Sequence, residues 1–148
     1  MNTSRLERLI AVVTVYQHNF RILHWRCVGA HFDTIHELMQ KYYEKLGEYL
    51  DELTEILMMN SDGTPISLPK ALSILEHGER PYIVLDGSEE YPDKKCFEVV
   101  KILFQHLLDD YAKVKGEVGE DVNSKLDEHS YWIRKELQYK LYQREGFR

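Results

Sequence analysis

The sequence predicts an all-α protein, a bundle of four long helices in which one long crossover, with a short helix of its own, joins the second helix to the third. Three observations predict this fold. Four segments carry apolar residues three and four positions apart, the period of a helix with one buried face. Short turns join the first two segments and the last two, whereas residues 60–91 separate the pairs. No segment alternates polar and apolar residues for long enough to build a sheet.

The first helix is expected to end at the turn that contains Gly29. Apolar side chains recur at helical spacing between residues 6 and 27, and a glycine just after such a stripe is a common helix terminator. Ser4 and Glu7 have the spacing of a capping box, in which two side chains bond to free backbone amides at a helix start. The sequence therefore predicts a helix with Ser4 as its N-cap.

The second helix follows the same turn. Its apolar stripe extends from residue 35 to residue 57, and Thr34 and Glu37 repeat the capping-box spacing at its start. We expect this helix to reach about Met59, because the sequence NSDGTP that follows is rich in turn-forming residues.

The rest of the chain supplies the crossover and the second helical pair. Within residues 60–91 the sequence PKALSILEHG, residues 69–78, predicts a short amphipathic helix with proline in its first turn. The only strand-like stretch, YIVL at residues 82–85, is too short to form a sheet. Two further apolar stripes predict a third helix within residues 92–119 and a fourth from about Asp121.

Composition indicates an ordinary globular protein, expected to be a single domain over residues 1–148. The chain is 43% hydrophobic and 30% charged, and it contains no apolar run long enough to cross a membrane. No secretory leader is recognised at the start, so a cytoplasmic location is expected. Cys27 and Cys96 form no metal-binding or redox motif, which predicts two reduced thiols.

Two histidines flank the first turn at similar distances. If the first two helices pack antiparallel, His24 and His36 face each other and can bind one transition metal ion. Asp51 and Glu55 share a helix face, but Asp51 lies roughly 22 Å beyond His36 along a straight helix. One chain therefore cannot close the site. Two chains can, if their second helices cross about a two-fold axis near residues 44–46.

The stretch LHWRCVGAHFDTIHELMQKYYEKLGEYLDELTE, residues 23–55, resembles the signature of the Dps mini-ferritins. The resemblance implies a ferritin-like four-helix bundle and a homo-oligomer of twelve subunits built from dimers. It also implies that Fe(II) is oxidised by hydrogen peroxide or oxygen at sites between subunits and that the iron is stored, which protects against oxidative stress. By that resemblance His24 and His36 are ligands from one subunit, and Asp51 and Glu55 are ligands from its neighbour.

One position departs from the family pattern. The pattern has a carboxylate four residues after the second histidine, where this chain has Gln40. An amide carries no negative charge, so a second iron is expected to bind more weakly there. This departure supports an alternative hypothesis: a catalytically impaired ferritin-like structural or interaction protein that keeps the dimer-forming helix.

Other residues have both a structural and a functional interpretation. Trp25, beside the first histidine, is a candidate catalytic electron donor, although packing in the subunit contact is the simpler expectation. Acidic residues around the turn between the third and fourth helices correspond to a pore for cations in the family, or they stabilise the start of a helix. These are Glu117, Glu120, Asp121 and Asp127. The remaining histidines considered are expected to be structural: His18, His77, His106 and His129.

The sequence also limits the choice of partners and cofactors. Imidazole and carboxylate ligands suit iron, but zinc and manganese are also possible. The formal charge is −6, and the end YQREGFR has only two arginines, so DNA binding is not expected. No nucleotide-binding or hydrolase motif is present, and no pair of Glu-x-x-His repeats would complete a di-iron site within one chain.

Overall fold

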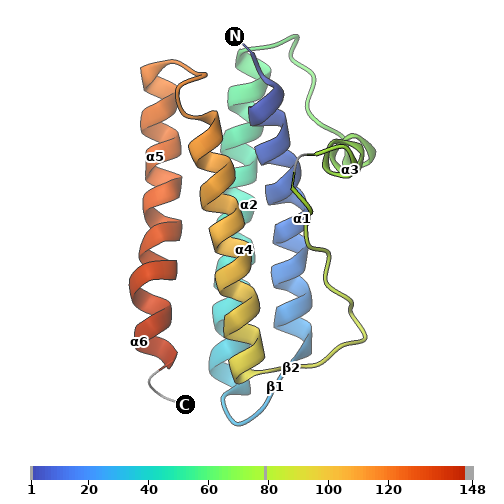
Figure 1. The fold of residues 1–148 in the computed structure, drawn as a ribbon, viewed down its shortest axis with the longest axis vertical. Coiled ribbons are helices and arrows are strands. Elements are labelled where there is room, and N and C mark those ends of the chain that lie inside the picture. The colour runs from blue at the N-terminus through green and yellow to red at the C-terminus, as the bar shows by residue number, and fades with distance from the viewer. Residues whose placement is uncertain (1, 79, 146–148) are drawn as a thin grey trace.

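A computed structural model describes residues 2–78 and 80–145 of the chain. Four long helices lie side by side, and a crossover with one short helix runs along the outside of the bundle (Figure 1). This confirms the predicted fold class. The helices are α1 (Ser4–Arg26), α2 (Phe32–Met59), α3 (Leu68–Glu76) in the crossover, α4 (Asp93–Val114) and α5 (Glu120–Lys135), which the π-helical η1 (Glu136–Lys140) and α6 (Leu141–Glu145) continue.

The start of α1 differs from the predicted capping box. Ser4 is the first helical residue, and Thr3 is the N-cap. The amide of Ser4 donates to Oδ1 of Asn2 at 2.9 Å, so an asparagine just before the helix satisfies this free amide. The hydroxyl of Thr3, not that of Ser4, bonds to Glu7, at 3.5 Å.

The predicted start of α2 is also wrong. The helix begins at Phe32, and its N-cap, His31, lies three residues before Thr34, the N-cap of the expected capping box with Glu37. Gly29 has a φ of +125°, and its carbonyl accepts a hydrogen bond from the amide of Phe32 at 3.2 Å. This tight turn reverses the chain so early that Thr34 is already helical.

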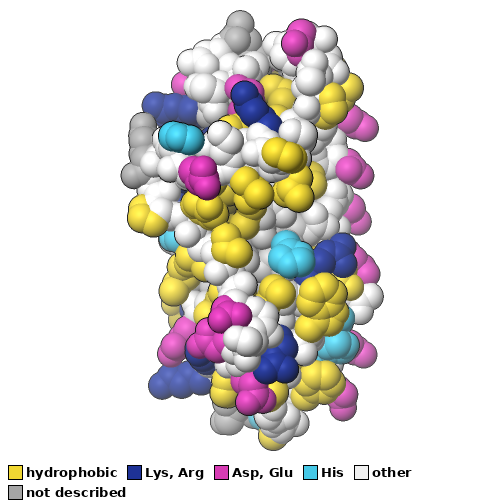
Figure 2. All heavy atoms as spheres, turned by 90° about the vertical axis from the view of Figure 1, so that its right-hand side faces the viewer, with side chains coloured by type: hydrophobic (Ala, Val, Ile, Leu, Met, Phe, Trp, Pro, Cys, Tyr) yellow, Lys and Arg dark blue, Asp and Glu magenta, His cyan; other side chains and the backbone are white. Residues whose placement is uncertain are grey.

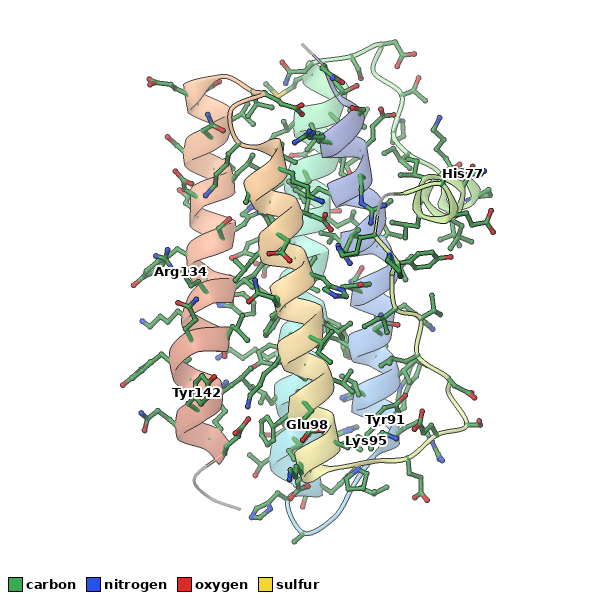
Figure 3. All side chains as sticks on the ribbon, in the orientation of Figure 1. His77, Tyr91, Lys95, Glu98, Arg134 and Tyr142 are labelled. Carbon is green, nitrogen blue, oxygen red and sulfur yellow. The ribbon has the colours of Figure 1, made fainter. Side chains whose placement is uncertain are left out.

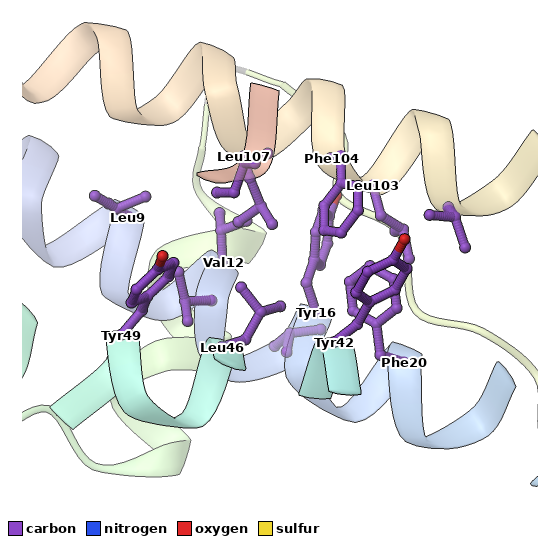
Figure 4. Close-up of a cluster of buried hydrophobic side chains, with 14 of the residues drawn as sticks. Leu9, Val12, Tyr16, Phe20, Tyr42, Leu46, Tyr49, Leu103, Phe104 and Leu107 are labelled. Atoms are coloured by element: carbon purple, nitrogen blue, oxygen red, sulfur yellow. The ribbon is translucent and has the colours of Figure 1, made fainter. Parts of the chain in front are cut away.

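The core contains large aromatic side chains between α1, α2 and α4 (Figure 4). The ring of Phe104 lies 5.2 Å from that of Phe20 and 4.9 Å from that of Tyr42, and all three side chains are fully buried. Tilted and edge-to-face arrangements at these distances are favourable for aromatic pairs. The apolar stripes of the predicted helices therefore meet in one cluster.

Side chains of α1 hold the crossover in place. Asn19, which is fully buried, donates to the carbonyl of Ile83 at 2.7 Å and accepts from the amide of Leu85 at 3.0 Å. Near the end of α1, Arg26 donates to the carbonyl of Glu89 at 3.2 Å. The segment YIVL therefore forms no strand, and a side chain of α1 bonds to its backbone instead.

Two strands of two residues were not predicted. β1 (Cys27–Val28) pairs in parallel with β2 (Tyr91–Pro92), and this pairing ties the turn after α1 to the start of α4. Lys95 lies beside Tyr91 near that end of the bundle, with its ammonium 5.2 Å from the ring centre (Figure 3). The pairing brings the C-terminal end of the long crossover next to the turn that His24 and His36 flank.

The fourth long helix contains a π-helical turn that periodicity did not predict. Glu136, at its start, is 1% exposed. Its carboxylate accepts from the hydroxyl of Tyr42 at 2.9 Å and from the guanidinium of Arg144 at 2.6 Å. These donors stabilise a carboxylate that would otherwise be costly to bury.

Candidate metal centre

His24 and His36 come together beside the turn between α1 and α2. Their rings stack with centres 3.6 Å apart and planes 15° apart. His24 is 8% exposed, and His36 is partly buried. The antiparallel pairing expected for these residues is therefore the one found.

Reciprocal hydrogen bonds fix the two rings. Nδ1 of His24 donates to the carbonyl of His36 at 2.7 Å, and Nδ1 of His36 donates to the carbonyl of His24 at 2.6 Å. A carbonyl can only accept, so Nδ1 carries the proton in each ring and the neutral imidazole has its lone pair on Nε2. Within the described part of the chain neither Nε2 has a hydrogen-bond partner. Both nitrogens are therefore prepared to bind a metal ion.

Aromatic neighbours hold the histidine pair from both sides. Phe32 stacks on His36 with ring centres 4.9 Å apart, and Tyr43 meets the ring of His24 edge-on at 5.4 Å. The guanidinium of Arg21 lies 4.1 Å from the ring centre of Tyr43. This packing restricts the rings to one orientation, which lowers the entropy lost when a ligand binds.

The two carboxylates lie elsewhere on α2. Asp51 and Glu55 are exposed and one helical turn apart, at the edge of a hollow of about 360 Å³ that Leu50 and Leu68 also line. Along a straight helix Asp51 is roughly 22 Å from His36. Among residues 2–78 and 80–145, no three histidine, cysteine, aspartate or glutamate side chains are grouped so that they could hold a metal ion. One subunit therefore presents two separate halves of a site.

Gln40 lies one turn beyond His36 on the exposed side of α2. Its amide nitrogen donates to Oε1 of Glu44 at 2.8 Å. The amide oxygen remains available as a neutral ligand, but this position supplies no negative charge.

Trp25 points outward beside the histidine pair. It is 57% exposed, and its ring meets that of His18 edge-on at 6.1 Å. Such a large exposed ring is available to a partner surface. Its role as an electron donor or as an interface residue stays a prediction.

The acidic residues near the turn between α4 and α5 are partly neutralised within the chain. Glu117 pairs with Arg5 at 3.3 Å, and Asp127 pairs with Lys115 at 2.6 Å. Glu120 and Asp121 lie in the first turn of α5, where negative charge stabilises the helix dipole. The cation pore stays a prediction.

A second polar cluster, which sequence reasoning did not single out, lies inside the bundle between α2, α4 and α5. The hydroxyl of Tyr111 bonds to Nδ1 of His129 at 2.7 Å, and Nε2 of His129 bonds to a carboxylate oxygen of Glu52 at 2.6 Å. Tyr49 stacks on His129 with ring centres 3.7 Å apart. Three helices contribute these residues, so no spacing along the chain reveals the cluster. We call Tyr49, Glu52, Tyr111 and His129 the tyrosine–histidine cluster.

Burial sets the protonation states in this cluster. Burial lowers the pKa of His129, and the hydrogen bond and charge of the neighbouring Glu52 offset only part of this change. It also raises the pKa of Tyr111 well above its ordinary value. For Glu52, burial raises the pKa, but the hydrogen bond from His129 and the charge of Lys125 lower it more, so the net change is downward. The cluster therefore contains a protonated phenol, a neutral imidazole and a carboxylate at neutral pH.

Comparisons with known proteins agree with the fold. The ferritin-like domain family matches residues 3–135. The chain is 26% identical over 121 residues to the "DNA protection during starvation protein" of Porphyromonas gingivalis, covering 82% of this chain and 74% of that protein. It is 29% identical over 123 residues to "Antigen TpF1" of Treponema pallidum, covering 80% of this chain and 62% of that protein. A structure of Dps from Listeria innocua soaked with cobalt is 25% identical, with a TM-score of 0.79 and coverage of 99% and 97% of the two chains.

Proposed function

Because the chain belongs to the ferritin-like family, as a divergent member of its Dps branch, we propose that it binds Fe(II) between subunits, oxidises it and sequesters the iron. The ligands are His24 and His36 of one subunit and Asp51 and Glu55 of its partner. The observation that carries this proposal is the histidine pair, in which both Nδ1–H groups donate to backbone carbonyls and both Nε2 atoms are free. Hydrogen peroxide or oxygen is the oxidant.

The donor set fits a first-row divalent ion. Two imidazoles and two carboxylates are ligands that suit iron, zinc and manganese. Which metal is bound therefore depends on which ions are available to the protein as well as on their affinity for the site. Hydrogen bonds from Nδ1 orient each ring and raise the basicity of Nε2. The Listeria innocua Dps structure soaked with cobalt makes Co(II) a suitable spectroscopic probe.

A two-fold axis across α2 brings the half-sites together. An axis near residues 44–46 lies about 13 Å from His36 in one direction and about 13 Å from the Asp51 and Glu55 turn in the other. Two antiparallel copies of α2 crossing there place each histidine pair beside the partner's carboxylates. We propose that such dimers assemble into a shell, with twelve subunits by resemblance.

Exposed apolar side chains surround the half-sites and support self-association. Leu68 and Leu72 on α3 are 60% and 40% exposed, and Figure 2 shows hydrophobic side chains gathered over α3 and the crossover. Phe32 and Trp25 are also exposed beside the histidine pair. A partner subunit on this face would cover apolar surface as it completes the metal site.

Bound Fe(II) supplies an electron to the oxidant, and the protein controls where this happens. The histidines and carboxylates hold iron at a fixed place, so that Fe(II) does not react freely in solution. Carboxylate ligands favour the higher positive charge of Fe(III) once it forms. Storage of the ferric product within the shell follows from the proposed assembly.

The alternative is a catalytically impaired structural or interaction protein. The observation that favours it is Gln40, whose amide bonds to Glu44 and leaves no carboxylate at the position that the family pattern uses. In this alternative the dimer forms, but Fe(II) oxidation is no faster than in buffer.

The two cysteines of the chain are consistent with a reducing compartment. Cys27 and Cys96 are both buried free thiols. No helix in residues 2–78 or 80–145 is both long enough and apolar enough to span a bilayer. We propose that the protein acts in the cytoplasm, where thiols stay reduced.

The test is stopped-flow absorbance of Fe(III) formation after peroxide is mixed with anaerobic, Fe(II)-loaded protein. We expect fast oxidation in the wild type and its loss in His36→Ala, whereas His77→Ala, an exposed histidine outside the site, keeps the wild-type rate. Circular dichroism should show equal helicity in the three proteins. Oxidation in the wild type at the rate of free iron would overturn the ferroxidase and favour the alternative.

A further inference from the structure

The proposed iron site requires a second source of electrons. Gln40 leaves the site one carboxylate short, so we expect a single Fe(II) to react at each site. One Fe(II) gives one electron, whereas reduction of hydrogen peroxide to water takes two. Without another donor close by, the second oxidising equivalent leaves as a hydroxyl radical and damages the protein. A buried side chain that gives one electron would prevent this.

The tyrosine–histidine cluster has the geometry that a one-electron donor needs. A phenol that loses an electron becomes a strong acid, so it must pass its proton to a base in direct contact. Nδ1 of His129 lies 2.7 Å from the hydroxyl oxygen of Tyr111. The carboxylate of Glu52 can only accept a hydrogen bond from Nε2 of His129, so Nε2 carries the ring proton. Nδ1 of His129 then directs its lone pair toward the phenol. The carboxylate would then stabilise the imidazolium that forms.

The cluster is also close to the proposed iron site. Tyr49 and Glu52 belong to the same turn of α2 as Asp51, one of the partner-side ligands, because neighbouring residues rise only about 1.5 Å each. The ring of Tyr49 lies flat on His129, with centres 3.7 Å apart. Packed side chains thus connect the ligand turn to Tyr111. Tyr111 itself is fully buried, which keeps a radical away from solvent and reductants.

Trp25 and Tyr16 each lack one of these features. Trp25 is 57% exposed, and no hydrogen bond from its indole nitrogen is found in the described chain. Tyr16 is buried and lies 2.7 Å from Nδ1 of His106, yet no carboxylate bonds to the other nitrogen of His106 in the described chain. Tyr16 is therefore a close structural control for Tyr111.

We propose that Tyr111 is a redox-active tyrosine, which gives one electron to the oxidant formed from peroxide and bound Fe(II) and passes its proton to His129. This inference rests on the proposed function. Fe(II) and Tyr111 each lose one electron, and peroxide with two protons becomes two waters. The phenol O–H bond breaks, Nδ1 of His129 takes that proton, and solvent supplies the two that peroxide needs. The products are Fe(III), a neutral tyrosyl radical and an imidazolium held by Glu52.

The first experiment is freeze-quench electron paramagnetic resonance after peroxide is added to protein loaded with less than one Fe(II) per subunit. We expect a tyrosyl radical in the wild type and in Tyr16→Phe, and its loss in Tyr111→Phe, which removes one oxygen atom and keeps the buried ring. Ring-deuterated tyrosine should change the hyperfine pattern of the signal. A radical of undiminished yield in Tyr111→Phe would overturn the proposal.

A count of oxidised iron per peroxide gives a second test. With Tyr111 as the second donor, the wild type should form about one Fe(III) per peroxide. In Tyr111→Phe the second oxidising equivalent either oxidises Fe(II) at another site, which moves the ratio toward about two, or escapes as hydroxyl radical. Spin trapping should detect more hydroxyl radical from Tyr111→Phe. Equal ratios and equal trapping in the two proteins would contradict the proposed role.

Metal-free protein separates this inference from the ferroxidase proposal. Azide radicals, made by pulse radiolysis, oxidise tyrosine by one electron without iron. A long-lived tyrosyl radical in the wild type and in Tyr16→Phe, absent in Tyr111→Phe, would support Tyr111 even if iron did not bind. Rapid iron oxidation with no radical from either method would overturn the role of Tyr111 and leave the ferroxidase intact.

Discussion

Two inactive variants should restore each other when they share a dimer, because each metal site takes its ligands from both subunits. His36→Ala removes one ligand from the histidine half, and Asp51→Asn with Glu55→Gln weakens the other half. The roughly 22 Å between these halves on α2 is far longer than any side chain, so neither variant can repair its own site. In a mixed dimer, one site has both damaged halves and the other has both intact halves.

The size of the effect follows from random pairing. Equal co-expression makes about half of the dimers mixed, and each mixed dimer has one intact site of two, so about a quarter of the wild-type sites return. Anaerobic Co(II) titration, followed by the visible absorption of the bound ion, measures the number of sites. The matched control is co-expression of His36→Ala with His24→Ala, which damages the same half in both chains and should restore none. Recovery no greater than in this control would refute a site shared between subunits.

Three further outcomes are expected. Gln40→Asp should add a second Co(II) per site and raise the rate of iron oxidation several-fold, and unchanged binding would show that this position does not face the metal. Glu136→Gln should lower the free energy of unfolding in urea by about 3 kcal/mol, because it leaves the charge of Arg144 without its buried partner. Stability should fall as the pH drops through the ordinary histidine pKa of 6.5, because burial lowers the pKa of His129 and unfolding releases it to bind a proton. His129→Gln should reduce the slope of this part of a urea-midpoint profile, to which His106 also contributes because burial lowers its pKa, and an unchanged profile would contradict the assignment.

The fold was predictable because each long helix buries one face. Spacing of apolar residues marked all four long helices and the short helix of the crossover, and α2 ends at Met59 as expected. Helix starts were less predictable. Asn2 and the turn at Gly29, not the two predicted capping boxes, decide where α1 and α2 begin, since several nearby polar residues can satisfy the same free amides.

The sequence by itself determined the two halves of the proposed metal site. His24 and His36 lie at matched distances from one turn, and Asp51 and Glu55 share a face of the next helix, so helix geometry alone places them. Local spacing also shows that one chain cannot join the two halves. These inferences need only the rise and period of an α-helix, which vary little between proteins.

Only the tertiary structure decided which atoms of those residues are free and which distant residues meet. The carbonyls that fix Nδ1 of His24 and His36 belong to the backbone of the opposite helix, and their reach depends on how α1 and α2 pack. Tyr111, His129 and Glu52 come from three helices, and no pattern along the chain connects them. The physical reason is that periodicity encodes which face of a helix is buried, whereas contacts between helices depend on their rotation and axial offset, which the whole core sets at once.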